Sequence, residues 1–181
     1  MRAMVLVGCG LGLMVVGLTL TRQLPRAAPP TATDQTPGDG VWLQSVNYSQ
    51  LVETIHQHRG KVVLVDFWAD YCPPCKRNLP HIIALHRQYA QRGLAVVTVS
   101  LDDAREPGQR DRVLGFLRQQ QADCLNLLLD EPVDVWQRKL NLDGPPCLFV
   151  FDRAGVLRLR ITDEQFDTQA FDRRVVELLG P

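Results

Sequence analysis

Residues 61–77 of the 181-residue chain read KVVLVDFWADYCPPCKR, and this stretch decides the fold. Its first seven residues form a short apolar run rich in β-branched side chains, which is typical of a strand buried on both faces. A short loop follows, and Cys72 stands where a helix is expected to begin, with Cys75 three residues later. Pro73 and Pro74 suit the first helical turn, because the amide hydrogens there have no partner within the helix. The stretch therefore predicts a strand, a tight loop and a helix that opens with a Cys-x-x-Cys pair.

The position of the two cysteines favours thiol–disulfide chemistry. Unpaired N–H groups and the helix dipole favour an anion at a helix start, so the thiolate of Cys72 should be stabilised there. The thiolate is the nucleophile in disulfide exchange. Cys75 lies nearly one turn later on the same side of the helix, where it can attack a mixed disulfide formed at Cys72. We therefore expect Cys72 to be the attacking cysteine and Cys75 the resolving cysteine.

Asp66 interrupts the apolar run six residues before Cys72. Burial disfavours the ionised form of a carboxyl group, so the proton affinity of Asp66 should rise. A protonatable acid beneath a dithiol can take up the proton that Cys75 must lose before it attacks. The alternative interpretation is an acid at a strand edge that reaches water.

Apolar runs and helical patterns alternate along the rest of the chain. Further strands are expected at 94–101, 125–129, 147–151 and 156–161, and helices after Asn47, at 73–91, 107–121 and 132–140, and before Gly180. The turn at 152–155 must join antiparallel strands, whereas strands joined by helices should be mainly parallel. This pattern predicts an α/β sandwich around a mixed sheet.

The N-terminal residues predict a membrane segment. Residues 3–20 carry no charge and would span roughly 27 Å as a helix, close to the thickness of a bilayer core. Arg22 and Pro25 interrupt the pattern that a signal-peptide cleavage site needs, so a retained signal-anchor over 1–22 is expected. A cleaved signal peptide and lipidation at Cys9 are the alternatives. Residues 23–40 are rich in proline and predict an extended tether, which leaves a globular domain at 41–181.

Composition excludes some classes of function. The chain has 20 Lys and Arg against 20 Asp and Glu, so it lacks the basic excess typical of nucleic-acid binding. Apolar residues make up 45%, enough for a packed core rather than a disordered chain. The four histidines share no metal-ligand spacing, and we expect neither a metal nor a cofactor.

Several motifs together resemble the thioredoxin superfamily. Residues 65–69 followed by 72–75 resemble its active-site segment, and Pro80 matches its helix-kinking proline. Residues 144–149 resemble its cis-proline loop. The anchor and the extra helix–strand stretch at 102–129 resemble the TlpA/ResA branch of membrane-anchored extracytoplasmic thioredoxins.

The resemblance implies a thioredoxin fold, with a mixed central sheet flanked by helices, and an insertion. It also implies thiol–disulfide exchange with protein substrates outside the cytoplasm, in the reductive direction and linked to cytochrome c maturation. The partners implied are protein thiols or disulfides and a membrane electron donor, for a monomer anchored in a bacterial inner membrane with its catalytic domain facing the periplasm. Pro146 would be the cis-proline that shapes the substrate groove.

The substrate surface is expected to combine that loop with residues around the cysteines. Pro145 precedes the expected cis-proline and has no N–H to donate to a bound peptide, so one substrate hydrogen bond should be lost. Trp68 and Tyr71 are expected to border the cysteines as an apolar contact surface, together with Pro73 and Pro74. Thioredoxins often place a lysine near the buried acid, but residues 94–101 offer none.

The remaining features leave alternatives open. Cys147 follows the expected cis-proline and could lie near Cys72 or form a disulfide with Cys124, although free cysteine is also simply a residue type that is often buried. Trp42 and Trp136 are expected in the core. A copper(I)-handling module that uses Cys72, Cys75 and Cys147 is the alternative function, and a redox-inactive adaptor is disfavoured because both paired cysteines are present.

Overall fold

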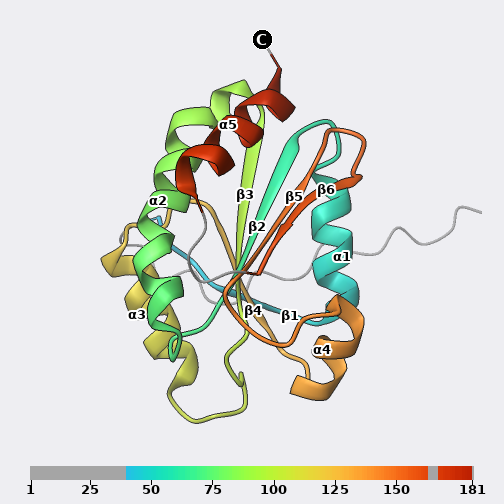
Figure 1. Cartoon of the computed structure of the whole chain (residues 1–181). Helices are drawn as coiled ribbons and strands as arrows, with labels where there is room; N and C mark the ends of the chain where they lie inside the picture. The colour runs from blue at the N-terminus through green and yellow to red at the C-terminus, as the bar shows by residue number, and fades with distance from the viewer. Residues whose placement is uncertain (1–39, 163–166, 181) are drawn as a thin grey trace, which may run out of the picture. The chain divides into compact units, whose positions relative to one another are not determined.

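The computed structural model describes residues 40–162 and 167–180, which form three layers around one six-stranded sheet (Figure 1). The strand order is β1-β4-β3-β2-β5-β6. The first four strands in this order are parallel, and β5 and β6 are antiparallel to their neighbours, as the sequence predicted for the hairpin. The strands are β1 (Gln44–Val46), β2 (Val62–Trp68), β3 (Leu94–Ser100), β4 (Leu125–Leu129), β5 (Cys147–Phe151) and β6 (Leu157–Ile161).

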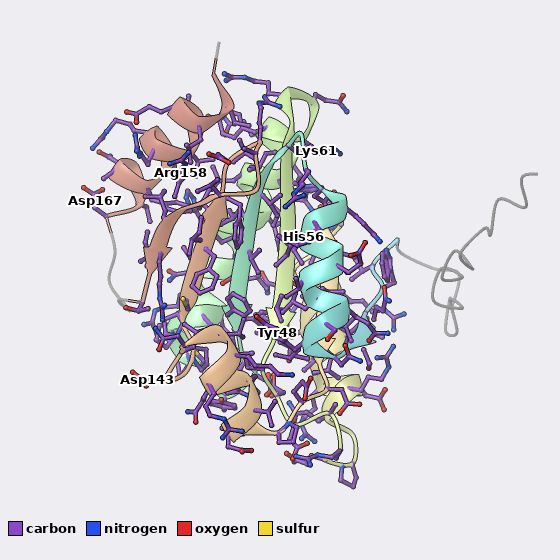
Figure 2. All side chains as sticks on the ribbon, turned by 90° about the vertical axis from the view of Figure 1, so that its right-hand side faces the viewer. Tyr48, His56, Lys61, Asp143, Arg158 and Asp167 are labelled. Atoms are coloured by element: carbon purple, nitrogen blue, oxygen red, sulfur yellow. A yellow bond between two sulfur atoms is a disulfide. The ribbon has the colours of Figure 1, made fainter. Side chains whose placement is uncertain are left out.

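Helices cover both faces of the sheet. One face carries α2 (Pro73–Tyr89), α3 (Gln109–Gln119) and α5 (Thr168–Leu179), and the other carries α1 (Tyr48–Gln57) and α4 (Val133–Leu140). A short 3-10 turn, η1 (Ala90–Arg92), follows α2. Figure 2 views the protein from the α1 side, where Tyr48 lies near the start of α1 and His56 near its end. The arrangement is the mixed α/β sandwich of a thioredoxin fold.

The sheet divides the core into two clusters of buried side chains, because successive residues of a strand point to opposite faces. All seven residues of β2 are buried. Leu64 and Trp68 pack in the cluster on the α2 side, and Val65 and Phe67 pack in the cluster on the α1 side. Coverage of both faces explains why the β2 run is apolar throughout instead of alternating with polar residues.

The expected caps and stops define the helix ends. Asn47 accepts the N–H of Gln50, and the Gln50 side chain accepts the N–H of Asn47, each at 2.9 Å. This capping box begins α1 directly after Asn47, where the sequence predicted a helix start. Gly93 ends η1 with φ +94°, a left-handed conformation that glycine adopts without steric cost. The α3 helix begins at Gln109, two residues later than predicted, after Gly108 in a left-handed conformation.

One prediction about the core is wrong, and one strand of the sheet was not predicted. Trp136 is buried as expected, but Trp42 has 44% of its surface exposed. Trp42 lies just before the edge strand β1, which the sequence did not predict because its three residues carry no clear pattern. Strand β1 pairs with β4 alone within the described residues.

The predicted signal-anchor at 1–22 and nearly all of the tether at 23–40 lie outside the described residues. Within 40–162 and 167–180, none of the helices has the length and apolar character needed to cross a bilayer.

Candidate active site

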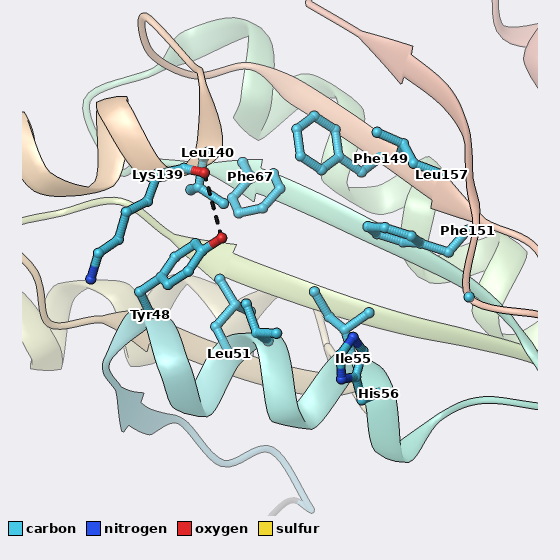
Figure 3. A pocket seen from close by; sticks show the side chains of 12 residues that line it. Tyr48, Leu51, Ile55, His56, Phe67, Lys139, Leu140, Phe149, Phe151 and Leu157 are labelled. Atoms are coloured by element: carbon cyan, nitrogen blue, oxygen red, sulfur yellow. Dashed lines mark hydrogen bonds between the residues drawn. The ribbon is translucent and has the colours of Figure 1, made fainter.

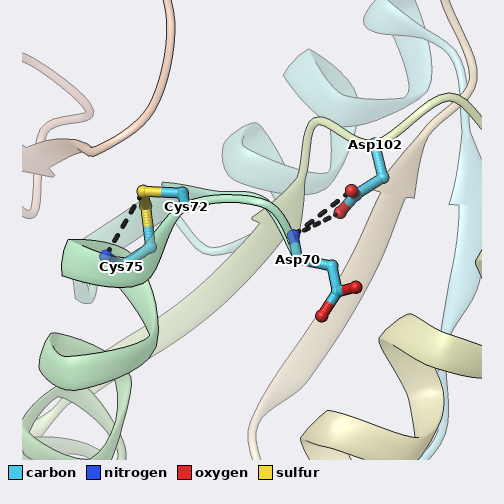
Figure 4. Close-up of a disulfide and its surroundings, with 4 residues drawn as sticks. All are labelled: Asp70, Cys72, Cys75 and Asp102. Carbon is cyan, nitrogen blue, oxygen red and sulfur yellow. Dashed lines mark hydrogen bonds between the residues drawn. A yellow bond between two sulfur atoms is a disulfide. The ribbon is translucent and has the colours of Figure 1, made fainter.

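The loop after β2 delivers Cys72 to the start of α2, where a disulfide joins it to Cys75 (Figure 4). The Cα atoms of the two cysteines are 5.4 Å apart. Cys72 is the N-cap residue, and its sulfur accepts the N–H of Cys75 at 3.3 Å. This amide, which has no acceptor within the helix, and the positive end of the helix dipole both stabilise negative charge on that sulfur. The geometry therefore has the features that the sequence predicted for an activated Cys72.

The first cysteine of the pair is slightly more exposed than the second. Cys72 is 5% exposed and Cys75 is 1% exposed. Tyr71, at 66% exposure, and the exposed Pro73 flank Cys72 on the surface. These two residues are therefore accessible to solvent beside the disulfide.

Trp68 does not belong to this surface, which corrects the prediction. Its side chain is fully buried, and it packs with Cys72 and Cys75 in the core cluster on the α2 side. The Trp68 ring lies 5.3 Å from the Phe116 ring, centroid to centroid. The direction of the Trp68 side chain follows from strand alternation, because residues four apart in a strand point to the same face. Trp68 therefore points to the same face as Leu64, beneath the helices on the α2 side. Trp68 therefore supports the active-site helix from below instead of contacting solvent.

Asp102 holds the loop that precedes Cys72, and sequence reasoning did not identify it. Its carboxylate accepts the backbone N–H of Asp70 at 2.9 and 3.2 Å (Figure 4). It also accepts the Ser100 hydroxyl at 2.8 Å. Asp102 is 3% exposed. Burial raises its pKa, although the hydrogen bonds from Asp70 and Ser100 act in the opposite direction. In the sequence, the signal that could have identified Asp102 is an acidic residue just after the end of a strand predicted to be buried.

Removal of this carboxylate should destabilise the protein. In Asp102→Ala the Asp70 amide and the Ser100 hydroxyl lose their acceptor, and we expect a loss of about 3 kcal/mol in the free energy of unfolding. Urea denaturation followed by circular dichroism measures this loss. Asp103→Ala, at the exposed neighbouring position, is the matched control and should lower the midpoint much less, because the ion pair that Asp103 makes with Arg105 is exposed to solvent. Equal midpoints for both variants would contradict the role of Asp102 as the anchor of the loop.

Asp66 lies in the interior, as expected, and not at a strand edge that reaches water. It is 4% exposed, and burial raises its pKa from 3.8 to about 7. One of its carboxyl oxygens, Oδ2, has no hydrogen-bond partner. Asp66 shares a strand face with Leu64 and Trp68, whose side chains pack in the same cluster as the two cysteines. The carboxyl therefore belongs to the layer beneath α2 and titrates near neutral pH.

The peptide bond between Pro145 and Pro146 is cis, as the resemblance implied for Pro146. Strand β5 begins at the next residue, Cys147, which pairs with Phe67 near the end of β2. The loop to Cys72 leaves β2 after Trp68. The register therefore places Pro146 and the cysteine loop at the same end of the neighbouring strands β2 and β5. Pro145 and Pro146 are both partly exposed there.

The structure corrects both redox alternatives for Cys147. Cys124 and Cys147 are free and buried, so they form no disulfide with each other. Cys147 packs in the cluster on the α1 side, whereas Cys72 and Cys75 pack in the cluster on the α2 side. Burial raises the pKa of each free thiol to about 12. Cys147 therefore does not lie with the paired cysteines, and among the described residues no three His, Cys, Asp or Glu side chains are grouped to hold a metal ion.

A separate hollow of about 240 Å³ opens between α1, α4 and the β5–β6 hairpin (Figure 3). Tyr48 borders it and donates its hydroxyl to the Lys139 carbonyl oxygen at 3.5 Å. Several lining residues belong to the α1-side cluster, so the hollow lies across the sheet from the disulfide. Its apolar lining includes Leu51, Ile55, Phe67, Phe149, Phe151 and Leu157.

Comparison with known families matches residues 60–157 to the family described as thioredoxin-like. The chain belongs to the thioredoxin-like family. The matched residues include β2, both cysteines of the pair, the cis-proline and the start of the hairpin. A protein of Chlorobium tepidum described as the thiol:disulfide interchange protein DsbE has a similar solved structure. The TM-score is 0.61 at 27% identity, over 70% of this chain and 85% of that chain.

The relatives of this chain include proteins named for thiol–disulfide exchange. The thiol:disulfide interchange protein HelX of Rhodobacter capsulatus is 29% identical over 154 residues, which cover 83% of this thioredoxin-like chain and 80% of HelX. The thiol-disulfide oxidoreductase ResA of Halalkalibacterium halodurans is 34% identical over 56 residues, 31% of this chain and 32% of ResA. The thioredoxin-like protein YneN of Bacillus subtilis is 28% identical over 109 residues, 58% of each protein. The chain thus matches less than two thirds of ResA and YneN, and its similarity to ResA supports the ResA-like part of the prediction.

Proposed function

We propose that this chain is a thiol–disulfide oxidoreductase that reduces disulfides of extracytoplasmic proteins. The observation that carries the proposal is the Cys72–Cys75 disulfide at the start of α2, with the Cys75 amide 3.3 Å from the Cys72 sulfur. The names of HelX and ResA support this activity. The predicted signal-anchor supports a location on a bacterial inner membrane with the domain in the periplasm, where cytochrome c maturation is the process that the resemblance implies.

The first step of the reduction uses Cys72. Its thiolate attacks one sulfur of a substrate disulfide, the substrate S–S bond breaks, and a mixed disulfide forms with Cys72. The other substrate sulfur leaves as a thiolate and takes a proton from solvent. The helix start and the Cys75 amide stabilise the attacking sulfur as an anion. Tyr71, Pro73, Pro74, Pro145 and Pro146 provide the surface against which the substrate chain lies.

The second step uses Cys75 and Asp66. The Cys75 thiol loses its proton to the Asp66 carboxylate, and the new thiolate attacks the Cys72 sulfur of the mixed disulfide. The remaining substrate sulfur leaves as a thiolate and is protonated. The substrate disulfide has then gained two electrons and two protons, and the enzyme holds the disulfide present in this structure. A dithiol donor, which we place in the membrane, must return two electrons to the pair before the next cycle.

Asp66 has a proton affinity suited to this transfer. Because burial raises its pKa to about 7, its ionised and protonated forms are both well populated near neutral pH. It can therefore take a proton in one cycle and release it before the next. An ordinary exposed aspartate would be almost wholly ionised and a much weaker base.

Insulin reduction and copper titration separate the proposed enzyme from the copper(I)-handling alternative. With dithiothreitol as the electron donor, the wild-type domain should accelerate the precipitation of insulin, and Cys72→Ser should reduce the rate to the background of dithiothreitol alone. Copper(I) should bind the reduced domain no more tightly than a simple Cys-x-x-Cys peptide, because Cys147 packs on the other face of the sheet. Tight copper binding without insulin reduction would contradict the proposal.

A further inference from the structure

A row of polar residues crosses the sheet beneath the active-site helix. Asp66 of β2 pairs with Thr98 of β3, and Thr98 pairs with Asn126 of β4. Paired residues of neighbouring parallel strands point to the same face, and the strands are about 4.8 Å apart, so adjacent polar groups are within hydrogen-bonding reach. Thr98 and Asn126 are fully buried, and Asp66 is 4% exposed. This row lies on the face covered by α2, where the side chains on either side of it are apolar.

Backbone carbonyl oxygens determine the orientation of the side-chain amide of Asn126. Its Nδ2 donates to the carbonyl oxygens of Ala122 at 2.8 Å, Cys124 at 3.0 Å and Trp42 at 3.3 Å. A flipped amide would place its oxygen against these three acceptors. The Asn126 Oδ1 must therefore face Thr98, and the Thr98 hydroxyl donates to it at 2.8 Å.

This hydrogen bond has a consequence for Asp66. A threonine hydroxyl has a single hydrogen, so Thr98 cannot donate to Asn126 and to Asp66 at the same time. The Asp66 Oδ2 atom is buried without a hydrogen-bond partner, as expected if its neighbour donates elsewhere. We infer that Asn126 is a positioning residue for the resolving step: by fixing the Thr98 hydroxyl, it leaves the Asp66 carboxylate without a hydrogen bond from its neighbour in the sheet. This role rests on the proposed function, in which Asp66 accepts the Cys75 proton.

Other groups near Asp66 do not replace the missing donor. The thiol of Cys124, just before β4, and the thiol of Cys147, on the opposite face of β5, interact with its charge. Both are neutral near pH 7 because burial raises the pKa of each to about 12. Leu148 of β5 is its other partner in the sheet. The covering helices bury apolar side chains in this cluster: Leu79 and Ile82 of α2, Val113 and Leu117 of α3, and Phe171 and Val175 of α5. Among the neighbours of Asp66 across the sheet, Thr98 is thus the residue whose hydroxyl could donate to the carboxylate.

Titration of Asp66 tests the inference without reference to activity. The carboxyl ¹³C signal of Asp66 in the oxidised protein, assigned with Asp66→Asn, reports its protonation midpoint. In Asn126→Ala the Thr98 hydroxyl is free to turn to the carboxylate, and the midpoint should fall by about 1 pH unit, as expected for a hydrogen bond to a charged group. The double variant Thr98→Val/Asn126→Ala has no hydroxyl to turn, and its midpoint should return to the wild-type value.

The double variant tests whether entering water, and not the Thr98 hydroxyl, lowers the Asp66 midpoint. Water that entered the space left by Asn126 would lower the midpoint equally in both proteins, and equal falls would overturn the inference. Thr98→Val alone keeps the test decisive if Asn126→Ala does not fold. Its midpoint should match the wild type within about 0.3 pH units, whereas a rise of about 1 unit would mean that Thr98 already donates to Asp66 and would overturn the inference.

A kinetic measurement distinguishes this inference from the proposed function. The pH profile of the resolving step should shift in Asn126→Ala by the same amount as the Asp66 midpoint. If the wild-type protein exchanged no disulfides at all, the proposed function would fail, and the ¹³C titration would still decide how Asn126 acts on Asp66. If the titration shifted but the rate profile did not, the positioning role in resolution would be overturned.

Discussion

The Cys75→Ala protein should accumulate as a stable mixed disulfide with its substrate, whereas Cys72→Ala should lose disulfide exchange by roughly 10³-fold or more. Cys72 is the sulfur at the helix start, it accepts the Cys75 amide, and it is the more exposed of the two. Without Cys72, no stabilised thiolate is present to attack the substrate disulfide. Without Cys75 the first step proceeds, but no neighbouring thiol displaces the captured substrate.

Mass spectrometry of the reduced variants after incubation with a disulfide-containing peptide measures the adduct. Cys75→Ala should gain the mass of one peptide half, and reduction with excess dithiol should release it. Cys147→Ala is a matched control for the loss of a buried thiol on the other face of the sheet, and it should turn over normally. An adduct that forms on Cys75 in Cys72→Ala would reverse the assigned roles. The same Cys75→Ala protein, expressed in cells, captures the natural substrate for identification.

Local sequence patterns were sufficient to predict most of the fold. The apolar runs at β2 and β3 have no alternation because helices cover both faces of the sheet, and this produced strand predictions within one residue of the observed ends. Asn47 and the two prolines after Cys72 marked helix starts for local reasons of hydrogen bonding. These features depend on residues that are close in the chain, so a single sequence carries them.

The features that were missed depend on residues that are distant in the chain. Cys147 follows the cis-proline, but only its pairing with Phe67 determines that it points toward α1. Asp102 acts on a loop 32 residues away, and Asn126 acts on Thr98 at a distance of 28 residues. The surface position expected for Trp68 is an error of another kind, because strand alternation alone puts Trp68 on the same face as the buried Asp66 two residues earlier. For Cys147 and Asn126, the sheet register, which the sequence did not predict, decides the contacts.

Asp66→Asn should make the protein more stable at pH 8, by at most about 4 kcal/mol, and should remove a pH dependence of its stability. Burial raises the pKa of Asp66 from 3.8 to about 7. Between these values the folded protein holds a proton that the unfolded chain has already lost. The free energy of unfolding therefore falls as pH rises from about 4 to about 7, and it levels off when the folded carboxyl has ionised.

Urea denaturation of the oxidised proteins between pH 4 and pH 8 measures this effect. The difference between wild type and Asp66→Asn isolates Asp66, because the other titrating groups contribute equally to both curves. One of these is His86, whose pKa burial lowers and which therefore gives a slope of the opposite sign. The difference in stability should grow steadily over three pH units. A difference that stays constant with pH would show that Asp66 titrates at an ordinary value in the folded protein.

The same substitution should slow the reaction that we propose. Asparagine cannot accept the Cys75 proton, so the resolving step near pH 7 should slow by roughly 10²-fold, while the first attack by Cys72 is unaffected. Single-turnover release of the second substrate thiol measures this step. An ionisable group buried without a donor is costly to the fold, and a gain in stability together with a loss in resolution rate would explain why an acid stands in an otherwise apolar strand. If Asp66→Asn stabilised the protein and left the pH–rate profile of resolution unchanged, the carboxyl would have no part in the proton transfer.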